Sequence, residues 1–181
     1  MITDRKKFLA VAGLGIFGTA VASPFSLEPE SPLKTEMAFK AEITLDKAME
    51  LGNTQHGNRR IIPITGGSFE GPGLKGVIVP GGADWQIVRD DGVAELEARY
   101  TLRTQDNALI YVINRGYRHG PPEVMQRLAK GEAVDPKEYY FRSTPVFETS
   151  SDQYKWLTHY IFIATGERKP NSVVLSFYKL L

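Results

Sequence analysis

The sequence predicts an all-β protein, a single antiparallel up-and-down β-barrel with one short helix. From Glu36 onward, short alternating or apolar runs are separated by Gly, Pro, Asn and Asp at intervals of about ten residues, as is typical of all-β chains. No internal repeat is visible, which argues against propellers and solenoids. The strands fit a barrel or a two-sheet sandwich, and tight turns between long neighbouring strands favour the up-and-down barrel.

The elements follow from this punctuation in chain order. The helix is expected at Pro121–Lys130, because two prolines stand where a helix can start, Glu123 lies near its positive end and Gly131 follows its end. Asp46–Leu51 is expected to form one helical turn. The expected strands are Glu36–Leu45, Arg59–Phe69, Lys75–Val79, Trp85–Arg89, Val93–Thr104, Ala108–Arg115, Phe141–Glu148, His159–Ala164 and Ser172–Lys179.

Composition narrows the classes of function. The chain has 181 residues, 42% of them hydrophobic and 10% aromatic, which indicates one ordinary globular domain rather than a disordered chain. Its formal net charge of +1 provides no field for a nucleic-acid backbone. The chain contains no cysteine, which excludes zinc fingers, thiol enzymes and iron–sulfur sites.

The N-terminus has the layout of a signal peptide. Arg5-Lys6-Lys7 precedes an uncharged run from Phe8 to Ala22 that ends in Ala20-Val21-Ala22. This run is too short and too rich in glycine to span ~30 Å of hydrocarbon comfortably, which disfavours a retained anchor. The alternative is an N-terminal helix of a cytosolic protein, in which each glycine would cost about 1 kcal/mol.

We therefore expect a signal peptide at residues 1–22, a proline-containing linker at 23–35 and a β-barrel domain at 36–181. The string Asp4-Arg5-Lys6-Lys7-Phe8-Leu9 also resembles a twin-arginine export signal in which Lys6 replaces the second arginine. The expected location is periplasmic or secreted, with the export machinery as a transient partner and no membrane attachment after cleavage. Residues 23–181 carry 19 basic and 20 acidic side chains, so the expected partner is a small molecule.

The hairpin Val93–Tyr117 carries the most geometric information. A two-residue turn at Asp106-Asn107 would pair Tyr100 with Ile113 and direct one set of side chains into the barrel. Such a cluster of tyrosines and one arginine at one end of an apolar face is rare in a packed core, so the ligand site is expected there. The face expected inside comprises Leu96, Ala98, Tyr100, Leu102, Leu109, Tyr111, Ile113, Arg115 and Tyr117.

The segment Pro80–Trp85 brings a carboxylate and a large ring beside flexible backbone at a strand start. Asp84 is the candidate general base, and Arg115 is the candidate stabiliser of negative charge. In the alternative interpretation Asp84 caps a turn, Trp85 fills the core and Arg115 reaches solvent at the rim. The candidate ligand-binding residues are Trp85, Tyr100, Tyr111, Tyr117 and Trp156.

Other motifs carry no chemistry. Two G-x-G-x-x-G strings start at Gly13 and Gly71, but one lies in the predicted signal peptide and the other precedes a β-run instead of a helix. The three histidines, His56, His119 and His159, lack metal-ligand spacing, and no G-x-S-x-G turn occurs. No cofactor and no metal are expected.

Five segments together resemble the DUF3237 family, also called UPF0311, over about Phe39–Tyr178. The resemblance implies a small antiparallel β-barrel and supplies no reaction; the Asp-Gly turn of the family is Asp106-Asn107 here. Because Arg99 lies in one of these segments, a polar interior would make Arg99 and Asn114 the pocket residues in place of Tyr100 and Arg115. The segments are Ile62–Gly67, Pro80–Trp85, Ala98–Tyr100, Asn114–Arg118 and Tyr139–Arg142.

The function expected from these observations is binding of a small aromatic or carboxylated organic molecule inside the barrel. The alternative is a metal-independent lyase or isomerase in which Asp84 moves a proton within the same pocket. A structural or assembly role ranks last, because the outward face of the hairpin is charged.

Overall fold

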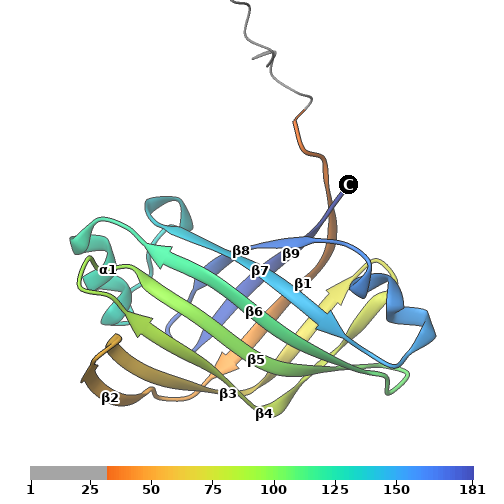
Figure 1. The fold of residues 1–181 in the computed structure, drawn as a ribbon, viewed down its shortest axis with the longest axis horizontal. Coiled ribbons are helices and arrows are strands. Elements are labelled where there is room, and N and C mark those ends of the chain that lie inside the picture. Colours follow the sequence, from red (N-terminus) through yellow and green to blue (C-terminus); the bar gives the residue numbers. More distant parts are fainter. Residues whose placement is uncertain (1–31) are drawn as a thin grey trace, which may run out of the picture. The chain divides into compact units, whose positions relative to one another are not determined.

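The computed structural model describes residues 32–181, which form nine strands, one α-helix and two short 3-10 helices (Figure 1). The predicted signal peptide and most of the predicted linker lie outside these residues. No helix within them is long and apolar enough to cross a bilayer. The elements are β1 Thr35–Leu45, β2 Met49–Thr54, β3 Gly57–Gly71, β4 Leu74–Val88, β5 Ala94–Thr104, β6 Leu109–His119, α1 Pro122–Ala129, η1 Pro136–Glu138, β7 Tyr140–Glu148, η2 Asp152–Thr158, β8 Phe162–Arg168 and β9 Ser172–Leu180.

The sheet closes into a barrel. Its hydrogen-bonded order is β1-β9-β8-β7-β6-β5-β4-β3-β2, and a further pairing of β1 with β3 closes eight of the nine strands into a ring. All pairings are antiparallel, and β2 pairs only with the first residues of β3. The predicted all-β class and the up-and-down barrel are therefore confirmed.

Most predicted elements are present, with three corrections. The predicted strands Lys75–Val79 and Trp85–Arg89 are one strand, β4, whose register against β5 shifts between Val79 and Ala83, where Gly81 has φ +107°. Asp46–Leu51 is not a helical turn, because β2 already begins at Met49. The predicted strand His159–Ala164 begins only at Phe162, because a bend at His159 and Tyr160 follows the 3-10 helix η2, which ends at Thr158.

The register predicted for the β5–β6 hairpin is wrong by one residue. The turn has three residues, because the Thr104 N–H donates to the Ala108 carbonyl oxygen with N and O 3.0 Å apart, and Asn107 adopts the left-handed region at φ +67°. Tyr100 consequently pairs with Val112 and Ala94 with Arg118. Since side chains alternate along a strand, this single extra residue reverses the faces of β6 relative to the prediction.

One half of the barrel interior is filled by aromatic rings. Phe39 stacks on Phe177 with ring centroids 4.2 Å apart, and Phe147 contacts Phe162 edge-on at 5.1 Å. η2 lies at this end, where the Tyr154 hydroxyl donates to Asp106 Oδ1 of the β5–β6 turn at 2.9 Å. We call this region the apolar half. In Figure 1, η2 and α1 lie at opposite ends of the barrel.

Candidate functional site

The half of the interior next to α1 is polar. Alternate positions of β4, β5, β6 and β7 point into the barrel, and at this end polar side chains occupy several of them. All are buried except Asp84, whose residue surface is partly exposed while its carboxyl group lies deep among barrel atoms. This group, called the polar half, comprises Asp84, Gln86, Tyr100, Asn114, Arg118 and Ser143.

A chain of hydrogen bonds holds the Asp84 carboxyl group. Arg60 Nε donates to Gln86 Oε1 at 2.9 Å, and Gln86 Nε2 donates to Asp84 Oδ2. The backbone N–H of Glu97 donates to the other carboxyl oxygen, Oδ1, at 3.1 Å. The carboxyl group is therefore fixed in orientation by β3, β4 and β5 together.

Four buried polar atoms have no hydrogen-bond partner within residues 32–181. They are the Tyr100 hydroxyl, Asn114 Oδ1, Arg118 Nε and the Ser143 hydroxyl, and their residues all line one cavity with Asp84. Leaving a buried polar group unpaired costs roughly 1–3 kcal/mol. A constellation of four such atoms around one cavity is unusual in a folded protein and indicates a site for a polar group.

Burial shifts the titration of these side chains. Burial raises the pKa of Asp84 against the opposing effects of the Gln86 hydrogen bond and the Arg118 charge. Burial, together with the charges of Arg60 and Arg168, lowers the pKa of Arg118 to about 10. Burial also raises the pKa of Tyr100, so its hydroxyl stays neutral and can act as a donor.

Three arginines stand where the cavity meets the barrel mouth. Arg118 and Arg168 line both the cavity and the mouth, and Arg60 lines the mouth beside them. None of the three forms an ion pair with a carboxylate of residues 32–181. Asp84 is the carboxylate whose charge acts on both Arg118 and Arg168. The mouth therefore has an excess of positive charge, which favours an anionic group.

The sizes of the two spaces differ greatly. The inner cavity has a volume of about 40 Å³, room for a few water molecules or one compact functional group. The mouth is an open space of about 1030 Å³ bounded by α1, the β1–β2 connection and the β8–β9 turn. Apolar side chains, among them Leu45, Ile62, Val88, Met125 and Leu128, line much of the mouth.

The structure separates the residues predicted for the site. Asp84 and Tyr100 lie inside the barrel and interact electrostatically. Asn114 also points inside, as the alternative face predicted, whereas Arg99 points outward and binds Glu97. Arg115 is on the outer face, with Nε 3.1 Å from Glu97 Oε2, so the predicted pairing of Asp84 with Arg115 inside the barrel is wrong.

The remaining predicted ligand-binding residues lie elsewhere. Trp85 and Tyr117 are exposed on the outer face, so Trp85 does not form a wall beside Asp84. Tyr111 also points outward, next to Arg99. Trp156 lies on η2 and packs near Phe162 at the apolar end. The predicted positions of Tyr111 and Tyr117 are wrong because the predicted turn was one residue too short. Those of Trp85 and Trp156 are wrong because the sequence carries no information on tertiary contacts.

Sequence reasoning missed Gln86, Arg118, Ser143 and the two mouth arginines. A signal for Arg118 existed, since it lies in the Asn114–Arg118 segment and a three-residue turn would have directed it inward. Arg60 and Arg168 come from strands far apart in sequence and carried no local signal. No cluster of three potential metal ligands is present in residues 32–181.

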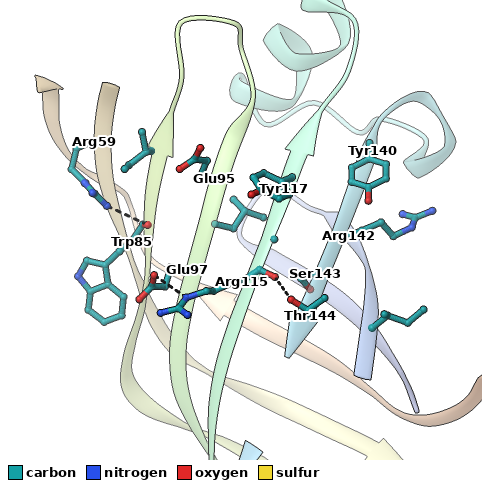
Figure 2. Close-up of a pocket in the computed structure, with 14 residues that line it drawn as sticks. Arg59, Trp85, Glu95, Glu97, Arg115, Tyr117, Tyr140, Arg142, Ser143 and Thr144 are labelled. Carbon is teal, nitrogen blue, oxygen red and sulfur yellow. Dashed lines mark hydrogen bonds and ion pairs between the residues drawn. The ribbon is translucent and has the colours of Figure 1, made fainter. Parts of the chain in front are cut away.

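A second hollow lies on the outside of the barrel wall, over β3 to β8 (Figure 2). This outer groove has a volume of about 640 Å³. Trp85, Glu97 and Arg115 lie along one side of it, and Glu95, Tyr117 and Arg142 along the other. Leu96 and Ser143, which point inward, line both this groove and the inner cavity, so a single layer of barrel wall lies between the two spaces.

Comparisons with known proteins agree with this architecture. The family described as "Protein of unknown function (DUF3237)" matches residues 33–180. Over 146 residues the chain is 45% identical to a UPF0311 protein of Clostridium acetobutylicum, covering 80% of this chain and 92% of that protein.

Two crystal structures are also similar. A conserved protein of unknown function from Rhodopseudomonas palustris is 41% identical with a TM-score of 0.82, covering 84% of this chain and all of that chain. A β-barrel-like protein from Acinetobacter baumannii is 46% identical with a TM-score of 0.74, covering 85% of this chain and 99% of that chain.

Proposed function

The chain belongs to the DUF3237 family, and we propose that its barrel binds a small organic molecule whose anionic or phenolic head enters the polar half. The observation that carries this proposal is the set of four buried polar atoms without partners around one cavity. A ligand head that formed hydrogen bonds with these atoms would offset the cost of burying them unpaired. Aromatic acids and phenols are therefore the ligand class.

The two spaces define the shape of this ligand. A cavity of about 40 Å³ admits a carboxylate or a hydroxyl group but not a ring. The body of the ligand would lie in the mouth, where Leu45, Ile62 and Met125 offer apolar contact. Arg118 Nε and the Tyr100 hydroxyl can donate to the head, while Asn114 Oδ1 can accept from it.

The test is a melting-shift screen of aromatic acids, phenols and terpenoids. A ligand that binds only the native state stabilises it by about 2.7 kcal/mol at a hundredfold excess over Kd. Carboxylated or phenolic compounds should raise the melting temperature, whereas their methyl esters or ethers should do so less. The proposal would be contradicted if no compound of any of these classes raised the melting temperature.

Matched arginine variants test the location. Arg118→Met should abolish the shift, because it removes the donor and the charge at the cavity. Arg142→Met removes an arginine from the outer groove and should leave the shift unchanged. Equal shifts for both variants would exclude the barrel interior as the binding site.

A second candidate function is supported by Asp84 itself. Its carboxyl group is oriented by two hydrogen bonds, its pKa is raised by burial, and it borders the cavity. A carboxylate with a raised pKa is a stronger base than an exposed one. Asp84 could remove a proton from a carbon of the bound ligand and return it at another carbon, while Arg118 stabilises the negative charge in between. The result would be an isomerisation without metal or nucleotide.

Binding and catalysis can be separated once a ligand is found. If Asp84 is the base, the bound ligand will exchange a carbon-bound proton for deuterium in D₂O, and Asp84→Asn will stop the exchange while retaining binding. No exchange in the wild-type protein after long incubation would leave the barrel a binding module.

We also propose that the barrel is exported. The support is the Arg5-Lys6-Lys7 step, the uncharged run that follows it and Ala20-Val21-Ala22. Mass spectrometry of the secreted or periplasmic fraction should find a terminus at or near Ser23. An intact Met1 or Ile2 terminus on the folded protein would contradict export, and unimpaired export after replacing Arg5 and Lys6 with Gln would exclude the twin-arginine route.

A further inference from the structure

The outer groove has a composition that differs from an ordinary solvated surface. Trp85, Tyr117 and Tyr140 are 37%, 52% and 44% exposed, and Ile163 lies beside them. Arg115 and Arg142 project among these rings (Figure 2). Trp, Tyr and Arg are the residue types enriched in protein interfaces, and exposed clusters of large apolar side chains on one face mark interaction sites.

The strand register orders these side chains into two rows across the barrel wall. Trp85, Glu97, Arg115 and Thr144 follow one another on β4, β5, β6 and β7, because Glu97 pairs with Arg115 and Arg115 with Thr144. The second row, one side-chain repeat further along the strands, is formed in the same way by Ile87, Glu95, Tyr117 and Arg142.

Charge is distributed antisymmetrically about the line between β5 and β6. In these two rows, β5 contributes Glu95 and Glu97, whereas β6 contributes Arg115 and Tyr117. The Arg115 side chain is 62% exposed and has only its Nε on Glu97, which leaves its other nitrogens available. Within the groove, two carboxylates beside two donors form the pattern that a two-fold axis converts into mutual complementarity, although Glu97 also accepts from Arg99 Nε at 3.0 Å and Glu95 lies 3.5 Å from Arg89.

We propose that a second copy of this chain packs on the outer groove, with a two-fold axis parallel to β5 and β6 and midway between them. This rotation brings β5 of one copy over β6 of the other. Glu97 then faces the partner's Arg115, and Glu95 faces the partner's Tyr117 hydroxyl, each contact occurring twice. An axis perpendicular to the strands through the groove would instead bring Glu97 toward the partner's Glu95, which like-charge repulsion disfavours.

Charge reversal with mixing tests this arrangement. Wild-type protein should sediment as a dimer, and Glu97→Arg or Arg115→Glu alone should raise the dimer dissociation constant by about tenfold or more. An equimolar mixture of the two variants should recover the dimer, because each contact between positions 97 and 115 across the axis is then between opposite charges. A purely intramolecular Glu97–Arg115 pair gives no recovery on mixing.

Controls keep the test decisive. Lys75→Glu reverses an exposed charge at the β3–β4 hairpin tip, away from the groove, and should leave the dimer intact. A wild-type monomer at every concentration, or a mixture no more dimeric than its components, would overturn the proposal. Small-molecule binding by the wild-type monomer that Tyr117→Ala abolishes would assign the groove to a ligand instead.

A second measurement covers the case in which a charge variant fails to fold. Because the chain has no cysteine, Glu97→Cys introduces a single thiol beside the axis. A short bis-maleimide should cross-link two copies of this variant but not of Lys75→Cys. Equal cross-linking of the two variants would overturn the proposal. The dimer does not depend on what the barrel interior binds, so either result stands apart from the proposed function.

Discussion

The two halves of the barrel interior differ in how they are packed, although one closed sheet builds both. In the apolar half, rings from β1, β7, β8 and β9 contact one another directly, as in the stacked pair Phe39–Phe177. In the polar half, inward positions of β4 to β7 carry Asp84, Tyr100, Asn114, Arg118 and Ser143, and four polar atoms lack partners in the described chain.

This difference separates the residues that stabilise the fold from the residues that form the candidate site. Close packing of rings is favourable in itself, because burial of apolar area and dispersion contacts both stabilise the native state. Buried charges and unpaired hydroxyl groups, in contrast, destabilise the native state, and they persist in proteins where a function requires them. The apolar half therefore supports the barrel, and the polar half is where we propose that a ligand binds.

The largest effect is expected from the apolar half. Phe39→Ala removes a ring in contact with Phe69, Phe147 and Phe177, and should lower the free energy of unfolding by about 3–5 kcal/mol. Denaturant unfolding measures this loss. The matched control, Leu109→Ala at an exposed position of β6, should change little. If Phe39→Ala lowered the free energy of unfolding by less than about 1 kcal/mol, the effect would be no larger than that of many surface substitutions. The aromatic cluster would then not be a main source of the stability of the barrel.

A pair of tyrosine variants compares the two halves directly. Tyr100→Phe removes a hydroxyl without a partner and should raise the free energy of unfolding by about 1 kcal/mol, while weakening ligand binding. Tyr154→Phe removes a hydroxyl that bonds Asp106 Oδ1 at 2.9 Å and should lower it by about 1 kcal/mol. Thermal unfolding of both variants gives the two signs. Destabilisation by Tyr100→Phe would show that its hydroxyl is already satisfied, for instance by an ordered water molecule.

Much of the barrel scaffold could be predicted from the sequence. Alternation along the strands identified Leu96, Tyr100 and Leu102 as inward residues of β5, and helix signals located α1 to within a residue or so at each end. These features depend on local periodicity and capping, which the sequence expresses directly. The closed barrel followed from strand lengths and tight turns.

The polar half could be predicted only in part, for a physical reason. Asp84 and Tyr100 were identified, but one turn residue, Asn107, decided whether Arg115 or Arg118 points inward. An asparagine in the left-handed region allows a three-residue turn as readily as a two-residue one, and sequence alone does not distinguish them. Arg60 and Arg168 reach the mouth from distant strands, so closure of the barrel, not local pattern, brings them to Arg118.

The smallest effect is expected from the titration of Asp84, because Gln86, Arg118 and Arg60 oppose the effect of burial on its pKa. A carboxyl group whose folded pKa lies above its ordinary value of 3.8 binds more protons in the native state than in the unfolded state. Its contribution to stability is therefore lost as pH rises through the window between the two values. Wild-type protein should lose stability relative to Asp84→Asn as pH rises from about 3.5 to 7, the range that spans ordinary and raised carboxyl values.

Asp91, on the outside of the barrel, supplies the control of opposite sign. The Val93 backbone N–H and Arg89 lower the pKa of Asp91, so its stabilisation is present above its ordinary pKa and is lost as pH falls. Wild-type protein should therefore gain stability relative to Asp91→Asn over the same rise in pH. Melting temperatures of the three proteins across this range measure both differences. Acid denaturation that is common to all three proteins cancels in these differences. If both differences changed with pH in the same direction, the Asp84 carboxyl group would not lie in a desolvated site. The contrast drawn between the polar half and the outer surface would then be wrong at Asp84.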